Sequence, residues 1–231
     1  MRRILCVEDE DAIREVIALN LRMAGYEVAE AGSAERALEL LNSDNTGFDC
    51  AILDIMLPGM NGFSLCESIR RDSATIGIIM LSAKAQESDK INGLAIGADD
   101  YMTKPFSVSE LMARVEALCR RVNRAAPEHQ GDSRLVSGAF ILDQKSRILY
   151  KNGEPIDLTQ VEFQIMELFF ANPGIAMVRD KILEGVWGEN YFGDVKIVDV
   201  NIRRLRMKIE DEPSNPQHIL TVWGYGYRWN A

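Results

Sequence analysis

The chain has 231 residues, of which 47% are hydrophobic and 26% charged, and its net charge is −9. This length fits two ordinary domains, and the composition excludes a disordered, collagen-like or low-complexity chain. No apolar run approaches the roughly 18 residues of a membrane span. The N-terminus has only a four-residue apolar run, where a signal peptide needs about 7–15 residues, so we expect a cytoplasmic protein with no membrane partner.

Residues 1–122 alternate short apolar runs with amphipathic segments. The expected strands are ILCV (4–7), 26–29, CAIL (50–53), IIML (78–81) and 101–103. Apolar residues at three- and four-residue spacing predict helices over 11–24, 33–42, 62–71, 87–95 and 107–122. Five such units predict a flavodoxin-like α/β domain, with a parallel five-stranded sheet of order 2-1-3-4-5 and helices on both faces.

The pattern stops at residues 123–134, NRAAPEHQGDSR, which we interpret as a linker. Residues 135–231 then predict a second domain of α+β type. Strand-like pieces punctuated by Gly138 and by Asn152-Gly153 come first, followed by helices over 159–172, 179–187 and 195–210. Thr159 and Glu162 predict a capping box at the start of the first of these helices. The glycine-rich segment ILTVWGYGYRW (219–229) predicts a closing hairpin.

Acidic residues gather where neighbouring strands of the first domain end. Glu8 and Asp9 follow the first strand and Asp54 follows the third, so the predicted strand order brings them together. Three close carboxylates need a counter-charge, which Mg²⁺ would supply, and a metal-held carboxylate can attack phosphorus. Ser82 and Lys104, at two further strand ends, would bind the transferred phosphoryl group. A single acid at a strand end is often only a solvated loop residue, but five matched positions argue against that alternative.

Four segments, VEDE (7–10), LDIMLPGMNG (53–62), LSA (81–83) and DDYMTKPF (99–106), closely resemble the receiver domain of bacterial two-component response regulators. The resemblance covers residues 2–122. It implies that Asp54 accepts a phosphoryl group from a sensor histidine kinase. It also implies Mg²⁺, or Mn²⁺ in its place, bound by Asp9, Asp54 and the backbone carbonyl of Met56, with Glu8 helping through water.

The same resemblance implies a conformational switch. Ser82, at a position that is usually Thr, would bind the phosphoryl group together with Ala83. Tyr101 matches an aromatic residue that turns inward when Ser82 moves, although a partly buried packing role is the alternative. Pro105 resembles a cis-proline that aims Lys104 into the pocket.

Charges of alternating sign over residues 90–121 are typical of a solvated face, and also of a surface that pairs with itself. In the OmpR/PhoB subfamily this face forms a two-fold homodimer, so opposite charges must meet across the axis. We expect the pairs Lys90–Glu110 and Asp100–Arg114. The predicted face comprises Lys90, Asp99, Asp100, Glu110, Arg114 and Arg121.

One basic stripe interrupts this acidic chain. Residues 196–208 hold five bases and one acid, while Val198, Ile202, Leu205 and Ile209 form an apolar stripe on the same helix. A basic helix face can be merely solubilising, but arginine and asparagine also read base edges. The residues predicted to lie off the apolar stripe and face DNA are Lys196, Asn201, Arg203, Arg204, Arg206 and Lys208.

Segments around this helix resemble the winged-helix effector domain of the OmpR/PhoB subfamily over residues 135–229. The matching segments are LTQVEFQIMELFFANPG (158–174), VWG (186–188), VDVNIRRLRMKIE (198–210) and TVWGYGYRW (221–229). The resemblance implies a recognition helix at 196–209 in the major groove and a wing over the minor groove.

The same resemblance implies roles for two residues of the wing and for one loop. Thr221 matches a phosphate-contacting position. Trp223 stands where many relatives have Arg, which leaves open whether it stacks, packs or contacts DNA only weakly. The loop 187–195 lies where family members can touch RNA polymerase.

The sequence therefore predicts a response regulator and not an enzyme. Phosphorylation would promote dimerisation and binding to a double-stranded operator with two half-sites, because dimerisation raises the effective concentration of the second DNA-binding domain. Two alternatives stay open: a DNA-binding regulator that works without phosphorylation, and a flavodoxin-like, metal-dependent phosphatase.

Overall fold

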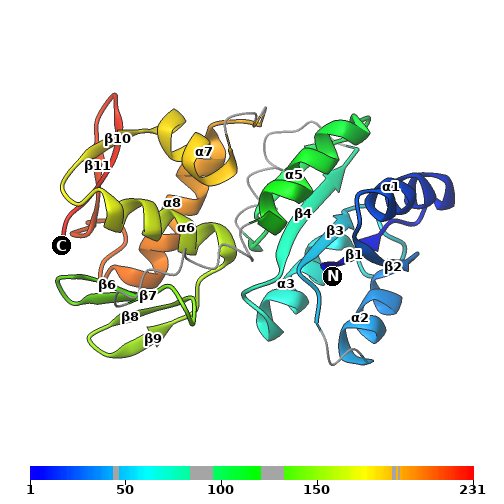
Figure 1. Ribbon diagram of the computed structural model, residues 1–231, viewed down its shortest axis with the longest axis horizontal. Coiled ribbons are helices and arrows are strands. Elements are labelled where there is room, and N and C mark those ends of the chain that lie inside the picture. Colours follow the sequence, from blue (N-terminus) through cyan, green and yellow to red (C-terminus); the bar gives the residue numbers. More distant parts are fainter. Residues whose placement is uncertain (44–46, 84–95, 121–132, 189–190, 192) are drawn as a thin grey trace. The chain divides into compact units, whose positions relative to one another are not determined.

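Figure 1 shows a computed structural model of the chain, which describes residues 1–43, 47–83, 96–120, 133–188, 191 and 193–231. The chain divides into two compact units, Met1–Val122 and Asn123–Ala231. The helix predicted at 87–95 and nearly all of the linker predicted at 123–134 lie outside the described residues. Among those described, no helix is both long and apolar enough to cross a membrane.

The first unit is a parallel sheet with helices on both faces (Figure 1). The strand order β2-β1-β3-β4-β5 confirms the predicted order, and every neighbouring pair is parallel. The strands are β1 (Arg3–Val7), β2 (Glu27–Ala31), β3 (Cys50–Asp54), β4 (Gly77–Ser82) and β5 (Asp100–Thr103). The helices are α1 (Asp11–Met23), which packs beside α5 (Val108–Arg120), and α2 (Ala34–Ser43), which packs beside α3 (Gly62–Asp72).

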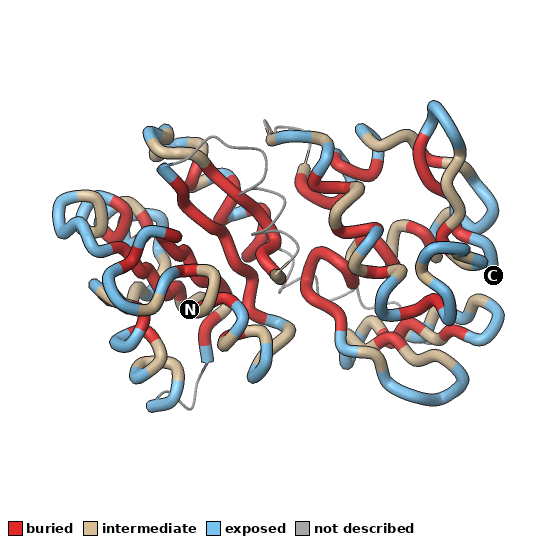
Figure 2. Tube along the Cα trace, turned by 180° about the vertical axis from the view of Figure 1, so that it is seen from behind, coloured by how far each residue is buried: buried red, intermediate tan, exposed pale blue. Residues whose placement is uncertain are grey.

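The central strands are buried from end to end, as their unbroken apolar runs predict. Every residue of β3 and β4 is buried, and Figure 2 shows these strands as continuous buried segments. The edge strand β2 is mostly half-buried, because it has a neighbour on one side only. Since both faces of the central strands are covered, their register is fixed, and their carboxyl ends come to one edge of the sheet.

The second unit combines two antiparallel sheets with helices. One sheet follows chain order: β6 (Arg134–Ser137), β7 (Phe140–Asp143), β8 (Ile148–Lys151) and β9 (Glu154–Ile156). The other has the order β10 (Ala176–Val178), β12 (Gly226–Trp229) and β11 (Ile219–Val222). The helices are α6 (Gln160–Ala171), α7 (Arg179–Trp187) and α8 (Lys196–Ile209), which agree with the predicted ranges to within one residue.

Local sequence rules account for most of these boundaries. The capping box is confirmed, because the Thr159 hydroxyl accepts from the Glu162 backbone and the Glu162 carboxylate accepts from the Thr159 backbone. Asn152 and Gly153 both have positive φ, as a type I′ hairpin turn requires. Strand β10 was not predicted, since three residues are too few to show a period.

Trp229 is the centre of the core of the second unit. It is fully buried, and its ring centroid lies 5.2 Å from that of Phe140 and 5.3 Å from that of Phe170. Its indole N–H donates to the Ser137 hydroxyl at 2.8 Å, so the polar edge of the ring is satisfied as well. The last strand of the chain is thereby fastened to the first sheet and to α6.

Trp229→Ala should lower the free energy of unfolding of the second unit by about 3–5 kcal/mol, because it leaves a large cavity. Trp223→Ala is the matched control: that side chain is exposed, so the change should stay within about 0.5 kcal/mol. Urea unfolding of the full chain, followed by far-UV circular dichroism, measures both. Equal effects of the two substitutions would contradict this account of the core.

Candidate functional site

The carboxyl edge of the parallel sheet brings together an acidic cluster and one lysine. Glu8 follows β1, Asp54 ends β3, and Lys104 follows β5. The Lys104 ammonium lies 2.8 Å from Oδ2 of Asp54 and 2.7 Å from Oε2 of Glu8. Both carboxylates are buried, so a single cation holds two desolvated anions.

Backbone geometry directs Lys104 into this cluster. The Lys104–Pro105 peptide bond is cis, as expected from the sequence. The backbone N–H of Lys104 donates to the carbonyl of Ser82 at 2.7 Å, which ties the segment after β5 to the end of β4. Ser82 itself is buried, and Ala83 beside it is exposed.

The acidic cluster has the donor set of a divalent cation site. Glu8, Asp9 and Asp54 each offer one carboxylate oxygen, and these oxygens lie within 4.8 Å of one another. Three carboxylates face the single charge of Lys104, so the cluster has an excess of negative charge that a hard cation would balance. The Met56 backbone N–H donates to Oδ1 of Asp54 at 3.1 Å, which holds the Met56 peptide beside the same carboxylate. The residues present therefore fit Mg²⁺.

The electrostatics of the cluster are dominated by burial. Burial, followed by the nearby Asp54 charge, raises the pKa of Glu8, although Lys104 acts in the opposite direction. Burial lowers the pKa of Lys104, but its hydrogen bonds to Asp54 and Glu8 outweigh that effect and leave the pKa raised. The ammonium form of Lys104 is therefore held at neutral pH.

Tyr101 lies on β5, next to the strand that carries Ser82. Its side chain is buried, and its backbone N–H donates to the Asp100 carboxylate at 2.7 Å. Met80 on β4 is its register partner, two residues before Ser82. Its burial fits a packing residue as well as the predicted switch aromatic.

Two predicted surface charges of the first unit are buried instead. Asp99 is fully buried, and its Oδ2 accepts from the Arg70 guanidinium at 2.6 Å and from the Ile78 backbone at 2.8 Å. Its predicted place on an exposed dimer face is therefore wrong: it fastens α3 to the start of β4. A pattern of alternating signs cannot show which charges already have partners inside the fold.

Asp100 and Arg114 pair within the chain. Asp100 is buried, and the Arg114 guanidinium lies 2.6 Å from its carboxylate and 2.7 Å from that of Glu110. The expected partners do meet, but across β5 and α5 of one chain, so neither is a free charge awaiting a second copy. The two other residues of the predicted face, Lys90 and Arg121, lie outside the described residues.

Helix α8 buries the predicted apolar stripe and one polar residue. Val198, Ile202, Leu205 and Ile209 are buried, as expected. Asn201 is buried too, and its amide donates to the Ile197 carbonyl at 2.9 Å. Its predicted place on the exposed face is wrong, because the buried face of α8 is wider than the stripe of apolar residues.

Three of the predicted DNA-facing cations are engaged inside their own unit. Arg204 and Lys208 lie 3.0 Å and 2.7 Å from the carboxylate of Glu162, which is fully buried at the start of α6. Burial raises the pKa of Glu162, but the Arg204 and Lys208 charges outweigh it and leave the pKa lowered. This buried ion cluster joins α8 to α6. From the sequence, Glu162 is predicted only as a capping residue. Its ion pairs could not be predicted, since no local pattern connects it with bases more than forty positions away.

Arg206 holds the closing hairpin. Its guanidinium donates to the Ile219 carbonyl at 2.6 Å and 3.0 Å and to the Thr221 hydroxyl at 2.9 Å. Thr221, a predicted phosphate-contacting residue, thus also accepts a bond from α8. A second tie joins the Tyr227 hydroxyl on β12 to Asp199 on α8 at 2.7 Å. Nothing in the sequence predicts this Tyr227–Asp199 pair, because the two residues are 28 positions apart and share no motif.

The exposed side of this unit keeps three predicted cations and one aromatic ring. Lys196 and Arg203 are exposed on α8, as is Lys208 although it also reaches Glu162. Trp223 is exposed at the tip of the β11–β12 hairpin. Met207 and Arg228 are exposed as well and were not predicted. Exposed cations on a helix joined to an exposed hairpin make a surface suited to a phosphate backbone.

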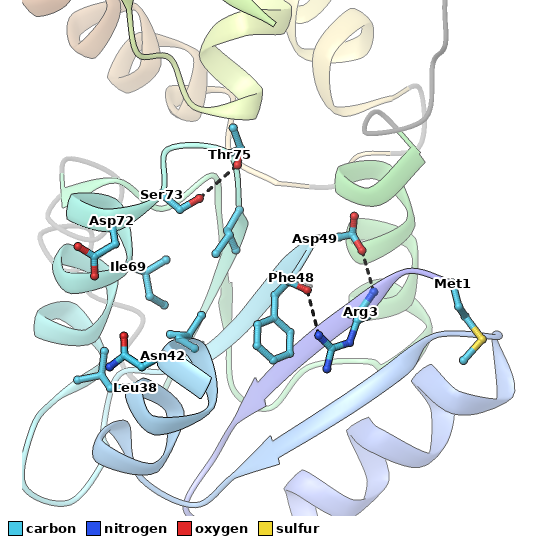
Figure 3. A pocket seen from close by; sticks show the side chains of 13 residues that line it. Met1, Arg3, Leu38, Asn42, Phe48, Asp49, Ile69, Asp72, Ser73 and Thr75 are labelled. Atoms are coloured by element: carbon cyan, nitrogen blue, oxygen red, sulfur yellow. Dashed lines mark hydrogen bonds between the residues drawn. The ribbon is translucent and has the colours of Figure 1, made fainter. Parts of the chain in front are cut away.

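A separate pocket of about 630 Å³ lies at the opposite edge of the parallel sheet, where strands begin (Figure 3). There the Arg3 backbone donates to Asp49 at 2.7 Å, and its guanidinium lies over the Phe48 ring. The Ser73 and Thr75 hydroxyls bond to each other at 3.2 Å. None of the predicted site residues lines this pocket.

Comparisons with known proteins match both units of the chain. Residues 4–116 match the family model of the response regulator receiver domain, and residues 153–229 match that of the transcriptional regulatory protein C terminus. The chain is 43% identical over 233 residues to the alkaline phosphatase synthesis transcriptional regulatory protein SphR of Synechococcus elongatus, covering 98% of this chain and 90% of SphR. It is 40% identical over 228 residues to the sensory transduction protein RegX3 of Mycolicibacterium smegmatis, covering 99% of each.

One solved structure matches the chain over its full length. The response regulator DrrB of Thermotoga maritima, described as an OmpR/PhoB homologue, is 29% identical, with a TM-score of 0.53 over the full length of both chains.

Glu162→Gln should lower the free energy of unfolding at pH 7 by about 3 kcal/mol, because it removes the buried negative charge that Arg204 and Lys208 neutralise while a capping box can still form. The pKa of Glu162 is lowered on folding, so its contribution is present above the ordinary value of 4.5 and is lost as the pH falls through the folded value. Urea unfolding from pH 7 to pH 3 should show the gap between wild type and variant closing. Glu154→Gln, on an exposed strand, is the control, and a gap that stays constant with pH would contradict the prediction.

Proposed function

Because the chain belongs to the OmpR/PhoB subfamily of two-component response regulators, which control transcription, we propose that Asp54 is its phosphoacceptor. The observation that carries this proposal is the Lys104 ammonium, 2.8 Å from Asp54 and 2.7 Å from Glu8, beside a third carboxylate on Asp9. Such a cluster can balance a transferred phosphoryl group on one side and a divalent cation on the other.

Asp54 would act as the nucleophile. One of its carboxylate oxygens forms a bond to phosphorus, and the bond between phosphorus and an imidazole nitrogen of the histidine kinase breaks. The imidazole keeps the electron pair and takes up a proton. Lys104 neutralises the added phosphoryl oxygens, and the Ser82 hydroxyl donates a hydrogen bond to one of them.

Glu8, Asp9, Asp54 and the Met56 carbonyl would hold Mg²⁺, for which Mn²⁺ can substitute. Bound there, the cation supplies charge neutralisation for the phosphoryl oxygens. Glu8 is the least direct of these residues, since its carboxylate is already held by Lys104, so we assign it a contact through water.

The phosphoryl group would then change the state of the whole chain. Ser82 moves toward the phosphoryl group with the support of Ala83, and Tyr101 packs inward behind it. We propose that this favours a homodimer, which raises the effective concentration of the second DNA-binding domain at an operator with two half-sites.

The DNA contacts come from α8 and the hairpin. We assign phosphate and base contacts in the major groove first to the exposed Lys196 and Arg203, and a supporting role to the three cations that hold α8 and the hairpin in place. These are Arg204, Arg206 and Lys208. Thr221 and Trp223 lie on the hairpin that would reach the adjacent minor groove.

Further partners follow from the same assignment. A sensor histidine kinase supplies the phosphoryl group, and RNA polymerase contacts the loop 187–195. Phosphoryl transfer to this chain and transcription both take place in the cytoplasm, which is where we place it.

Two other functions are less well supported. A phosphorylation-independent regulator would keep this cluster only as a scaffold, and the third carboxylate, on Asp9, would then have no role. A metal-dependent phosphatase would need a pocket for an external substrate at the carboxyl edge, and it leaves the basic helix without a role. We therefore propose that the acidic cluster with Lys104 serves as a phosphorylation switch and does not turn over an external substrate.

Incubation of the full chain with a small-molecule phosphodonor and Mg²⁺ should add one phosphoryl group to the wild type and none to Asp54→Asn, because the amide is not a nucleophile. Intact-mass spectrometry measures this, and a sizing column should show a shift from monomer to dimer. Asp72→Asn, an exposed acid on α3, is the control and should be modified like the wild type. Equal modification of Asp54→Asn, or none of the wild type, would refute the assignment.

Arg203→Ala should weaken DNA binding and lower the slope of log K against log salt concentration by about 1, because one phosphate neutralisation is lost. The free energy of unfolding should change by less than about 0.5 kcal/mol, since the side chain is exposed. Fluorescence anisotropy of a labelled duplex between low and moderate salt measures the slope. Arg71→Ala, an exposed base on α3, should leave it unchanged; an unchanged slope for Arg203→Ala would remove that residue from the interface.

A further inference from the structure

The tip of the β11–β12 hairpin presents a large aromatic ring to water. Trp223 is 90% exposed, whereas the two other tryptophans, Trp187 and Trp229, are 3% and 0% exposed. Tyr225, two residues on, is about half exposed. A tryptophan is a costly residue to leave in water, because its apolar surface is among the largest of any side chain.

The backbone under Trp223 is a defined tight turn. The Tyr225 N–H donates to the Val222 carbonyl at 3.0 Å, and Gly224 has a φ of +72°. A type II turn requires positive φ at its third residue, which glycine adopts without strain. Trp223 is thus the second residue of the turn, with its backbone fixed by the strand pairing of Val222 with Gly226.

The hairpin is also fixed relative to α8. The Arg206 guanidinium on the helix donates to two groups of β11, the Ile219 carbonyl at 2.6 Å and the Thr221 hydroxyl at 2.9 Å. Tyr227 on β12 bonds to Asp199 on the helix at 2.7 Å. Wherever α8 docks, Trp223 is carried to a fixed position beside it.

We propose that Trp223 is a DNA-contacting wedge, which stacks against a base step in the groove beside the one that α8 enters. The proposal rests on the function proposed above and deepens it. Minor-groove proteins insert apolar side chains between base pairs, and a planar indole can do this where a cation cannot. DNA is the occupant favoured here, because the ring is rigidly linked to the basic helix.

This role gives Trp223 an influence on sequence preference and not only on affinity. Partial unstacking costs least at pyrimidine–purine steps, which are the most flexible. The operator should therefore contain such a step at the position of the wing. A stacking contact also adds affinity without adding a phosphate contact, so it leaves the salt slope unchanged.

The experiment uses the chain's own fluorescence. Iodide should quench mainly Trp223 in the free protein, since the other two tryptophans are buried. The probe is the best duplex selected by phosphorylated wild-type protein from a random pool, and a fluorescein label on it gives anisotropy independently. Binding should lower the tryptophan emission and protect it from iodide. Trp223→Phe, which can still stack, should bind nearly as well as the wild type, whereas Trp223→Ala should bind roughly tenfold more weakly with the same salt slope.

Several outcomes would overturn the proposal. Trp223 that stays as accessible to iodide in the complex as in the free protein is not stacked. Equal affinity of Trp223→Ala and Trp223→Phe means that the ring contributes nothing to binding. Protection that grows with protein concentration in the absence of DNA, or loss of dimer in Trp223→Ala with unchanged binding to one half-site, assigns the ring to a protein contact instead. If the wild type binds no duplex by anisotropy, the proposed DNA-binding function fails first, and the wedge fails with it.

Discussion

The interaction on which the first unit depends is the bond of one ammonium group to two buried carboxylates. Lys104 holds Glu8 and Asp54 at the end of a sheet whose central strands are buried on both faces. Without this cation the two anions would be desolvated and unpaired, which is among the most destabilising arrangements in a protein. Because Asp9 adds a third carboxylate, the balance remains negative, and a divalent cation is the natural complement. A site balanced in this way responds strongly to added charge, and a phosphoryl group on Asp54 adds charge at the point where Lys104 acts.

The second unit uses the opposite arrangement to hold its basic helix. One buried carboxylate, that of Glu162, pairs with two cations of α8, Arg204 and Lys208. The capping box fixes Glu162 at the start of α6, so the carboxylate has a definite position before the cations reach it. A buried ion cluster is weak evidence for stability, but it specifies one arrangement of the helices. The rotation of α8 about its axis, and hence the side chains that it exposes, follows from this cluster together with the apolar stripe.

The sequence predicted what depends on period and strand order. Apolar runs and their spacing suffice to predict the five parallel strands, and the rule that parallel strands end at one edge places Glu8, Asp54 and Lys104 together. Contacts between residues far apart in the sequence leave no periodic pattern, so the sequence could not predict them. Asp99 was placed on the surface because its charge fits an alternating pattern, yet Arg70, twenty-nine residues earlier, takes it into the core. Asn201 was placed outside because it is polar, yet the buried face of α8 includes it.

These internal contacts change what the basic stripe can do. Five bases lie within residues 196–208, but Arg204, Arg206 and Lys208 are engaged by Glu162 and the hairpin. The positive charge that α8 presents outward is therefore smaller than the sequence suggests, and it is set in a chain of net charge −9. Non-specific attraction to phosphate is then weak, and discrimination between sequences rests on the few base contacts of α8 together with contacts that do not depend on charge. A tryptophan on a rigid turn, tied to the helix by Arg206, is such a contact, and the same bonds that remove Arg206 from the DNA surface are what hold Trp223 in place.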